Sequence, residues 1–438
     1  MRIIIRLLLI LIFFGIVAGV ILYARGYRFD FTTKSISPTG IIATSSSPRA
    51  SKVYVNGTLK GVTDLNLTLP PDKYFVEVKR EGYSTWSKEI TLKGELVMIV
   101  DPVLFPLNPS LSPVTNLGIV KAIPLDGTER VLLFSDTNDP LRDGIYLFDT
   151  SKRPLSFFPP LKTIVLKKNI PNSDSISLKD TNIYFSPDYK QFVAEFKYGA
   201  DSSLTEDYLF NTDSENQTPF DTSQSKASIL EAWNTEKIDA DSKILQTYPK
   251  DIAKIASDSF HILSFSPDEN KFLYIAKEPV TIPLVISPPL IAANQTAEER
   301  SVQKDKLYVY DKKEDKNFPI NINVSFDQSQ KEKLSVTPTR PPLRLTPKKA
   351  GVSVENSPLL LADESLPILW YPDSKHLVFN ENKRLSVSDY DGKNKQIVYS
   401  GPFDGSFFTA TSDGKVIVLA NLNPENNQFP DLYVVGIR

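Results

Sequence analysis

The sequence has no cysteine, and this absence excludes several kinds of chemistry at once. Disulfides, thiolate catalysis and Cys-ligated zinc or iron–sulfur sites all depend on cysteine. Histidine is almost absent too, since the chain has 2 of them, and it has 18 glycines in 438 residues. The sequence contains no glycine-rich phosphate loop, no His-Glu-x-x-His motif and no dinucleotide fingerprint. It therefore predicts no metal and no cofactor.

Neither sign of charge is in excess. Lys and Arg total 50 against 52 Asp and Glu, which gives a formal net charge of -2. This balance offers no basic surface for nucleic acid, so no nucleic-acid partner is expected. Proline, at 33 residues, is frequent, and the 11% of aromatic residues fall in short alternating runs typical of β-rich proteins. The length is sufficient for two or three domains.

A long uncharged run lies at the N-terminus, from Leu7 to Ala24. A helix of this length rises about 27 Å, close to the ~30 Å hydrocarbon core of a bilayer. Tyr23 lies at the end of this run, and Arg25 and Arg28 lie just beyond it. Aromatic and basic residues are typical of a membrane interface. We therefore expect residues 1–28 to form a transmembrane signal anchor that crosses the membrane through residues 7–24.

A cleaved signal peptide is the alternative to an anchor, although its apolar region is usually about 7–15 residues long. Orientation is harder to predict, because Arg2 and Arg6 on one side nearly balance Arg25 and Arg28 on the other. We expect the bulk of the chain to be extracytoplasmic, since a cytosolic β protein has little need of a signal anchor.

Residues 39–100 alternate short apolar strands with turns. Asn56-Gly57 is a two-residue hairpin signal, because these residue types tolerate positive φ. Leu65 to Leu69 and Tyr74 to Val78 alternate apolar and polar side chains, as half-buried strands do. About five strands in so short a stretch predict a small β-sandwich.

This stretch resembles the PEGA domain family of surface-layer and envelope proteins. The residues that match the family pattern are Gly40, Ser47-Pro48, Ala50, Val53 to Gly57, Gly61, Thr63, Leu69, Pro71, Tyr74, Val76, Val78 and Gly82-Tyr83. The chain departs from the pattern at three turns, where it has Pro48 to Ser51 for the name-giving tetrad, Asp64 for proline and Asp72 for glycine. The resemblance implies an envelope role and no catalytic residues.

A turn followed at once by an apolar strand occurs five times from about residue 117 onward. The turns contain Asp126-Gly127, Pro187-Asp188, Pro267-Asp268, Pro372-Asp373 and Asp413-Gly414. The strands that follow are Val131 to Phe134, Phe192 to Phe196, Phe272 to Ala276, Leu377 to Phe379 and Val416 to Ala420. A second strand ends in Asp or Asn in four of the five copies, as in Ile145 to Asp149 and Leu385 to Asp389.

The repeat resembles the WD40-like, TolB-type β-propeller repeat, in which a Ser-Pro-Asp-Gly turn precedes an apolar strand. Here Tyr189, Glu269 and Ser374 stand in place of the glycine, and Tyr371 replaces the serine in one copy. The resemblance implies a β-propeller over residues 117–438, with five visible repeats and room for six or seven blades.

Three stretches interrupt the repeats, and a linker over residues 101–116 precedes them. Residues 225–257 space Ile229, Leu230 and Trp233 as in a helix, which predicts a helical insertion. Residues 279–304 are proline-rich and are expected to be irregular, and residues 328–357 have the composition of a flexible loop. The expected fold class is all-β: a transmembrane helix, a small PEGA-like sandwich and a propeller with a helical insertion.

Only carboxylates offer a route to catalysis. His261 and His376 lie beside apolar strand residues without a sequence-local partner, so a Ser-His-Asp site is not expected. The carboxylates weighed for a glycosidase or for calcium are Asp239, Asp241, Asp389 and Asp391. All four are more simply interpreted as turn and loop residues, so no catalytic, cofactor-binding or metal residue is assigned.

We expect a membrane-anchored envelope protein that presents a β-propeller outside the membrane to bind a protein or polysaccharide, without catalysis. Two alternatives stay open. One is an anchored carboxylate-type glycoside hydrolase that acts on surface polysaccharide. The other is a structural envelope spacer with no specific ligand.

Overall fold

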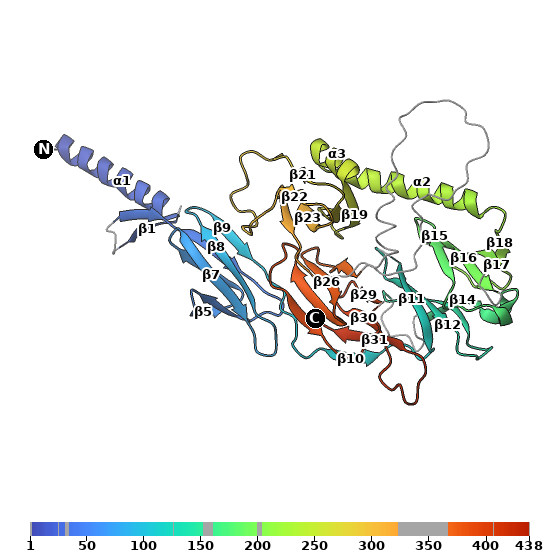
Figure 1. Cartoon of the computed structure of the whole chain (residues 1–438). Helices are drawn as coiled ribbons and strands as arrows, with labels where there is room; N and C mark the ends of the chain where they lie inside the picture. The colour runs from blue at the N-terminus through green and yellow to red at the C-terminus, as the bar shows by residue number, and fades with distance from the viewer. Residues whose placement is uncertain are drawn as a thin grey trace, which may run out of the picture. The chain divides into compact units, whose positions relative to one another are not determined.

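The computed structural model describes residues 2–24, 26–30, 35–125, 127–151, 161–198, 204–322, 367–405 and 407–437. The predicted loop over residues 328–357 lies outside the described residues, as do Arg25 and Asp126. The described chain is mostly β with few helices (Figure 1). It divides into two compact units, unit 1 with residues 1–107 and 286–297, and unit 2 with residues 108–285 and 298–438.

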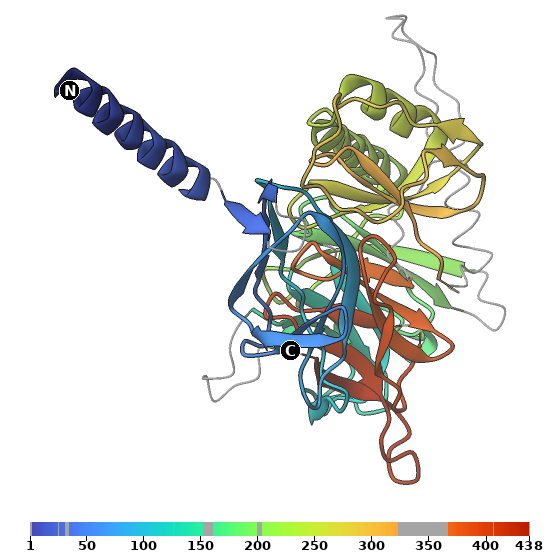
Figure 2. The same ribbon diagram turned by 90° about the vertical axis from the view of Figure 1, so that its left-hand side faces the viewer.

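Unit 1 begins with the apolar helix α1 (Arg2–Ala24), whose side chains are almost all exposed. The span Ile3–Ala24 is long and apolar enough to cross a membrane, and it is the one such helix among the described residues. A single-pass anchor and a signal sequence both fit this helix. The two-stranded hairpin of β1 (Tyr27–Asp30) and β2 (Ser35–Pro38) follows it (Figure 2).

Two sheets form a sandwich over the stretch where small strands were predicted. In the first, β3 (Gly40–Thr44) lies between the antiparallel β6 (Leu65–Leu69) and the parallel β9 (Val97–Val100). The second has the strand order β5 (Thr58–Val62), β4 (Lys52–Val55), β7 (Asp72–Lys79) and β8 (Trp86–Leu92).

The core between these two sheets follows from alternation along the strands. Val53, Val55, Val76 and Val78 point inward and are at most 3% exposed, because every second side chain of a strand faces the same side. The estimate of about five strands was too low, since β3 to β9 make seven. One of the strands that was not predicted is β5. Its sequence shows no alternation, and nearly all its residues are exposed.

Residues 101–116, which were expected to be a linker, contribute buried side chains and a strand to the two units. Leu104 and Phe105 are each 1% exposed, and Leu104 packs in the sandwich core. Five residues beyond Phe105, β10 (Ser110–Pro113) pairs with the strand β31 (Asp431–Gly436) near the other end of unit 2.

The described residues of unit 2 form five antiparallel four-stranded sheets, numbered here along the chain. Sheet 1 consists of β11 (Ile119–Leu125), β12 (Arg130–Ser135), β13 (Gly144–Asp149) and β14 (Leu161–Leu166), and sheet 2 of β15 (Asn182–Phe185), β16 (Gln191–Tyr198), β17 (Leu204–Asn211) and β18 (Phe220–Asp221). Sheet 3 consists of β19 (Phe260–Phe265), β20 (Lys271–Ala276), β23 (Leu307–Asp311) and β24 (Lys316–Pro319). Sheet 4 consists of β25 (Ile368–Trp370), β26 (His376–Glu381), β27 (Arg384–Asp389) and β28 (Gln396–Tyr399), and sheet 5 of β29 (Phe408–Ala410), β30 (Val416–Ala420), β31 and β10. The 3-10 turns η1 (Lys167–Asn169) and η2 (Ser173–Ser175) lie between sheets 1 and 2.

The repeated apolar strands predicted from the sequence are confirmed as the second strand of each sheet: β12, β16, β20, β26 and β30. Their continuous apolar character reflects burial on both faces, which is clearest in β30, where all five residues are buried. The predicted second strands of the repeat are the third strands, β13, β17, β23, β27 and β31.

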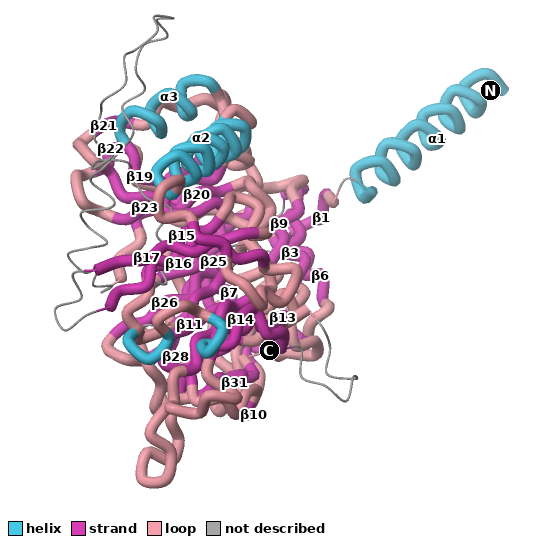
Figure 3. The backbone as a smooth tube through the Cα atoms, turned by 90° about the vertical axis from the view of Figure 1, so that its right-hand side faces the viewer, coloured by secondary structure: helices cyan, strands magenta, loops and turns pink. Residues whose placement is uncertain are grey.

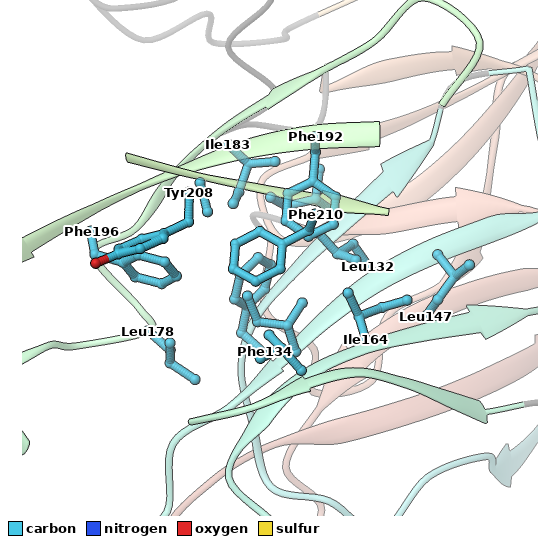
Figure 4. Packing of buried hydrophobic residues seen from close by; sticks show 14 of the residues in the cluster. Leu132, Phe134, Leu147, Ile164, Leu178, Ile183, Phe192, Phe196, Tyr208 and Phe210 are labelled. Atoms are coloured by element: carbon cyan, nitrogen blue, oxygen red, sulfur yellow. The ribbon is translucent and has the colours of Figure 1, made fainter. Parts of the chain in front are cut away.

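Apolar clusters join neighbouring sheets. Figure 4 shows the cluster between sheets 1 and 2, where Phe134 and Leu147 approach Phe192 and Phe210, whose ring centroids are 5.1 Å apart. Sheets 1 and 5 share a cluster that contains Ile119, Val131, Phe148, Ile417, Leu419 and Leu432. Sheets 3 and 4 share one that contains Leu273, Val309, Ile368, Trp370, Leu377 and Phe379.

The predicted helical insertion is present as α2 (Lys226–Leu245) and α3 (Lys250–Ser259), which lie between sheets 2 and 3 along the chain (Figure 3). Leu230 of α2 packs against Tyr184 and Val193 of sheet 2, whereas Ile252 of α3 packs in the core of sheet 3. Lys226, at the start of α2, forms ion pairs with Glu195 and Asp207 on the strands of sheet 2. The helices thus contact the sheets on both sides of them.

The proline-rich stretch over residues 279–304 is only partly irregular. The short strands β21 (Val280–Thr281) and β22 (Ser301–Val302) pair at its two ends. Between them, residues 286–297 belong to unit 1, whereas the whole stretch was expected to be an insertion in the repeats. Contacts that join sequence positions about 200 residues apart leave no local pattern, so this assignment could not be predicted.

Candidate functional site

The turn that opens each repeat is held by its own side chains. In sheet 2, Asp188 accepts hydrogen bonds from the Ser186 hydroxyl at 2.8 Å and from the Lys190 backbone N–H at 3.1 Å. Asp268 makes the equivalent bonds to Ser266 and Asn270 in sheet 3, at 2.6 and 3.2 Å. Burial alone would raise the pKa of Asp268, but the hydrogen bonds from Ser266 and Asn270 outweigh it and lower the pKa to about 2.

The residues that replace glycine in these turns still adopt the left-handed conformation. Tyr189, Glu269 and Ser374 have φ of 54°, 55° and 58°, and Gly414 at the matching position has φ of 83°. Side chains other than glycine are disfavoured there. The turn geometry is therefore retained even where the glycine of the repeat pattern is missing.

A polar pair follows the turn in four sheets, and it explains the Asp or Asn that ends the next strand. Gln191 pairs in register with Asn211, Lys271 with Asp311, His376 with Asp389 and Arg130 with Asp149. In sheet 3, Lys271 Nζ lies 3.7 Å from Asp311 Oδ2 and 4.8 Å from the centre of the Tyr390 ring. Lys271 is only 7% exposed, so the pair is an internal part of the scaffold.

His376 has two carboxylate partners. Its Nδ1 lies 2.7 Å from Asp373 Oδ2, and its Nε2 lies 3.3 Å from Asp389 Oδ1. Burial, with 4% of the residue exposed, would lower the pKa of His376, but the bonds to Asp373 and Asp389 raise it to about 9. The prediction that His376 lacks a sequence-local partner is wrong, because Asp373 lies three residues before it in the same turn.

The other histidine, His261, lies partly exposed on β19. Burial and the neighbouring Lys277 lower its pKa to about 4, so it is uncharged at neutral pH. At neutral pH, His261 is therefore uncharged and His376 is protonated.

The structure does not bring the four weighed carboxylates together. Asp239 and Asp241 lie on the exposed middle of α2, so their interpretation as turn or loop residues is wrong. Asp389 ends β27 and accepts hydrogen bonds from its surroundings, including Asn394 Nδ2 at 2.8 Å. Asp391 is buried in the next turn, where it accepts a bond from the Lys393 N–H at 3.1 Å.

These carboxylates build turns and strand ends. Among the residues that the structure describes, no group of three or more His, Cys, Asp or Glu is placed to hold a metal ion. We call the end of the sheets at which these turns lie the turn end; the loops between the second and third strands lie at the opposite end.

The loop between β12 and β13, residues 136–143, is held rigidly by one buried carboxylate. Asp143 is 3% exposed and accepts bonds from the Thr137 N–H at 2.7 Å, the Thr137 hydroxyl at 2.9 Å and the Asp139 N–H at 3.0 Å. On the outside of this loop, the side chain of Leu141 is 75% exposed. A fixed backbone therefore presents an apolar side chain to the solvent.

Two further loops contact this one. Asp431 accepts bonds from the Thr115 hydroxyl at 2.9 Å and the Leu117 N–H at 2.7 Å, which orders residues 114–118. A Cβ on Gly118 would lie 2.7 Å from Thr137 and 3.4 Å from Phe429, so the three loops are in close contact. We call residues 114–118, 136–143 and 421–430 the loop end.

The loop end was not predicted, because a single exposed leucine in a polar loop forms no pattern. The motif that orders the loop, Asp139-Pro140 followed by Asp143, is visible only as a turn signal. Exposed apolar side chains on rigid loops suit recognition of another macromolecule, with the surrounding amides and carboxylates as hydrogen-bonding groups.

No curated protein matches the chain in sequence. Among solved structures, the chain is similar to a eukaryotic initiation factor (8% identity, TM-score 0.18), over 87% of this chain and 66% of that one. It is similar to a puromycin-hydrolyzing peptidase of Mycobacterium tuberculosis (12%, 0.19), over 83% of this chain and 44% of that one. A third is the tricorn protease (10%, 0.15), over 93% of this chain and 38% of that one.

The chain spans no more than 66% of any of these three structures. Their TM-scores are too low to show a shared fold. Residues 39–105, which include the whole sandwich of β3 to β9, match the PEGA domain family.

Proposed function

We propose that the chain is a membrane-anchored envelope protein that presents a five-bladed β-propeller outside the membrane. The propeller binds a protein or glycan partner through the loop end, without catalysis. The observation that carries this proposal is sheet 5, in which β10 precedes all the other sheets in sequence and yet completes the last one. A ring of sheets closes in this way when the first and last segments of the repeat region share a sheet.

Contacts between consecutive sheets support the ring. Apolar clusters join sheet 1 to sheets 2 and 5, and sheet 3 to sheet 4, while the insertion α2–α3 contacts sheets 2 and 3. The Tyr371 hydroxyl of sheet 4 donates to the Gly414 carbonyl of sheet 5 at 2.6 Å. Four of the five pairs of neighbouring sheets are thus in direct contact, and the helices α2 and α3 connect the fifth pair, sheets 2 and 3.

Two features of unit 1 support the proposed location. The apolar helix α1 fits a single-pass anchor, and the PEGA match over residues 39–105 supports an envelope location. The carboxylates in the turns are engaged by N–H and hydroxyl groups, which argues against a hydrolase built from them. The exposed apolar side chain of Leu141, on a loop held by Asp143, supports binding instead.

The absence of cysteine allows a direct test of both location and binding. Leu141→Cys provides a single thiol at the loop end, and Lys415→Cys provides one at the turn end as the matched control. A membrane-impermeant maleimide applied to intact cells should label both variants. Labelling that occurs only after lysis would contradict the extracytoplasmic location.

The same two thiols, carrying a benzophenone maleimide, report on the partner. After irradiation, Leu141→Cys should cross-link to an envelope protein or glycan that Lys415→Cys does not capture. A partner captured equally from both positions, or from neither, would contradict binding at the loop end. Hydrolysis of a glycan by the full chain, lost on substitution of one Asp or Glu, would favour an anchored hydrolase.

A further inference from the structure

We propose that the outer face of the three-stranded sheet of unit 1 lies on the surface of a lipid bilayer. This face consists of Ile41, Ala43, Asn66, Thr68, Val97 and Ile99. The inference rests on the proposed function in one respect, namely that α1 is retained as a membrane anchor. It adds a second contact with lipid, made by the sandwich itself.

The composition of this outer face is unusual for a solvent-facing sheet. Ile41 pairs in register with Thr68 and Val97, and Ala43 pairs with Asn66 and Ile99. The edge strand β9 exposes 51% of Val97 and 77% of Ile99. Sheets with one face in water normally alternate apolar inward and polar outward residues, but here four of the six outward residues are apolar and none is charged.

The other sheet of the sandwich provides the contrast. Its outward residues on β7 are Lys73, Phe75, Glu77 and Lys79, and on β8 they include Glu89. Lys73 and Glu89 form an exposed ion pair at 3.3 Å. A charged face of this kind is fully compatible with water, so the two outer faces of the same sandwich are suited to different surroundings.

A short tether keeps the apolar face close to the end of α1. Gly26, two residues after the helix, accepts a hydrogen bond on its carbonyl from the Thr39 N–H at 2.9 Å, and it donates to the Tyr23 carbonyl at 3.1 Å. The hairpin between Gly26 and Thr39 therefore adds no length to the tether. Strand β3 begins at the next residue, Gly40, and Ile41 is the first member of the face.

Because this tether is short, lipid is the expected occupant of the face. The headgroup layer is about 5–8 Å thick on each side of the hydrocarbon core. A tether of a few residues cannot reach far beyond a layer of this thickness. A face that starts two residues beyond Thr39 is thus held at the interfacial layer, where aliphatic side chains are favourably buried among headgroups. A second copy of the chain could cover the same face, and the experiment separates the two.

The test uses the full chain in phosphatidylcholine nanodiscs, with and without nitroxide-labelled lipid. Single cysteines carry an environment-sensitive NBD probe at Ile99→Cys, at Phe13→Cys within α1 and at Thr58→Cys on the exposed β5. We expect nitroxide lipid to remove roughly half of the emission at positions 13 and 99 and little at position 58. Ile99 is exposed, so its replacement should leave folding intact.

The outcomes distinguish this inference from the proposed anchor. Quenching at position 13 without quenching at position 99 would overturn the inference and leave the anchor standing. No quenching at position 13 would overturn the anchor, and the inference with it. Emission at position 99 that is insensitive to nitroxide lipid but changes when two chains share a nanodisc would assign the face to a second copy instead.

Discussion

The side-chain amide of Gln295 forms two hydrogen bonds with the backbone of Thr91, 204 residues earlier in the chain. Its Oε1 accepts from the Thr91 N–H at 2.6 Å, and its Nε2 donates to the Thr91 carbonyl at 2.9 Å. Thr91 lies on β8, the edge strand of its sheet. The amide thus occupies the free edge as the peptide group of another strand would, which removes a template for unwanted pairing.

Gln295→Ala should weaken this edge. Loss of two neutral hydrogen bonds is expected to lower the free energy of unfolding by about 1–2 kcal/mol. Hydrogen exchange should also become faster in the peptide that covers Trp86–Leu92. The matched control is Gln246→Ala, which removes an exposed amide that donates to Ser242 in the last turn of α2, the helix just before it. Equal effects of the two substitutions would show that Gln295 does not close the edge.

His376 and His261 should give opposite pH dependences of stability. The folded-state pKa of His376 is raised from 6.5 to about 9, so between these values the folded chain binds more protons than the unfolded chain. Its contribution is complete below pH 6.5 and is lost as pH rises towards 9, by about 1–3 kcal/mol. His261 has a pKa lowered from 6.5 to about 4, so stability should fall as pH falls through that range.

Denaturant unfolding from pH 4 to 9 measures both slopes. His261→Gln should remove the loss on the acidic side and leave the alkaline loss intact, whereas His376→Gln should do the reverse. Because His376 is buried and its variant can fail to fold, NMR titration of the imidazole in the unmodified chain provides a second measurement. A His376 pKa near 6.5 would contradict its placement between Asp373 and Asp389.

Much of the secondary structure was predictable because it is encoded locally. Runs such as Val416 to Ala420 are apolar on both faces, and in sheets 2 to 5 the turn before the run carries an Asp that accepts hydrogen bonds within the turn. The helical spacing of Leu230 and Trp233 likewise predicted α2. These patterns depend on neighbours within a few residues, which is the range that a single sequence displays.

Contacts between distant segments were not predictable. Nothing in Ser110 to Pro113 indicates pairing with β31, and nothing in Gln295 indicates contact with Thr91. The partner of His376 was missed for a different reason. Asp373 was interpreted only as a turn residue, although its second carboxylate oxygen was free to bond a side chain three residues later.

Restoring glycine in the repeat turns should have opposite effects at two positions. Glu269 is exposed at φ of 55°, so Glu269→Gly relieves backbone strain and should stabilise the chain by about 0.5–1 kcal/mol. Tyr189 has nearly the same φ, but its ring lies 5.4 Å from the Phe185 ring and packs on the core of sheets 1 and 2.

Tyr189→Gly should therefore destabilise the chain by about 1–3 kcal/mol, because lost aromatic packing exceeds the relief of strain. Thermal unfolding of both variants measures the two effects. Stabilisation by both substitutions would mean that Tyr189 contributes no packing energy.

Closure of sheet 5 can be tested with an engineered disulfide, since the chain offers no competing thiol. Ser112 on β10 and Val434 on β31 are partners in register, and antiparallel partners have Cα separations of about 4.5–5.5 Å that a disulfide spans. The Ser112→Cys and Val434→Cys double variant should cross-link on oxidation without loss of folding. By constraining a loop of roughly 300 residues in the unfolded chain, the bond should stabilise unit 2 by up to about 5 kcal/mol. Reduced protein and the Ser112→Cys single variant serve as controls. A thiol pair that stays unreacted in the folded chain would show that β10 and β31 are not neighbours, and the closed ring would lose its main support.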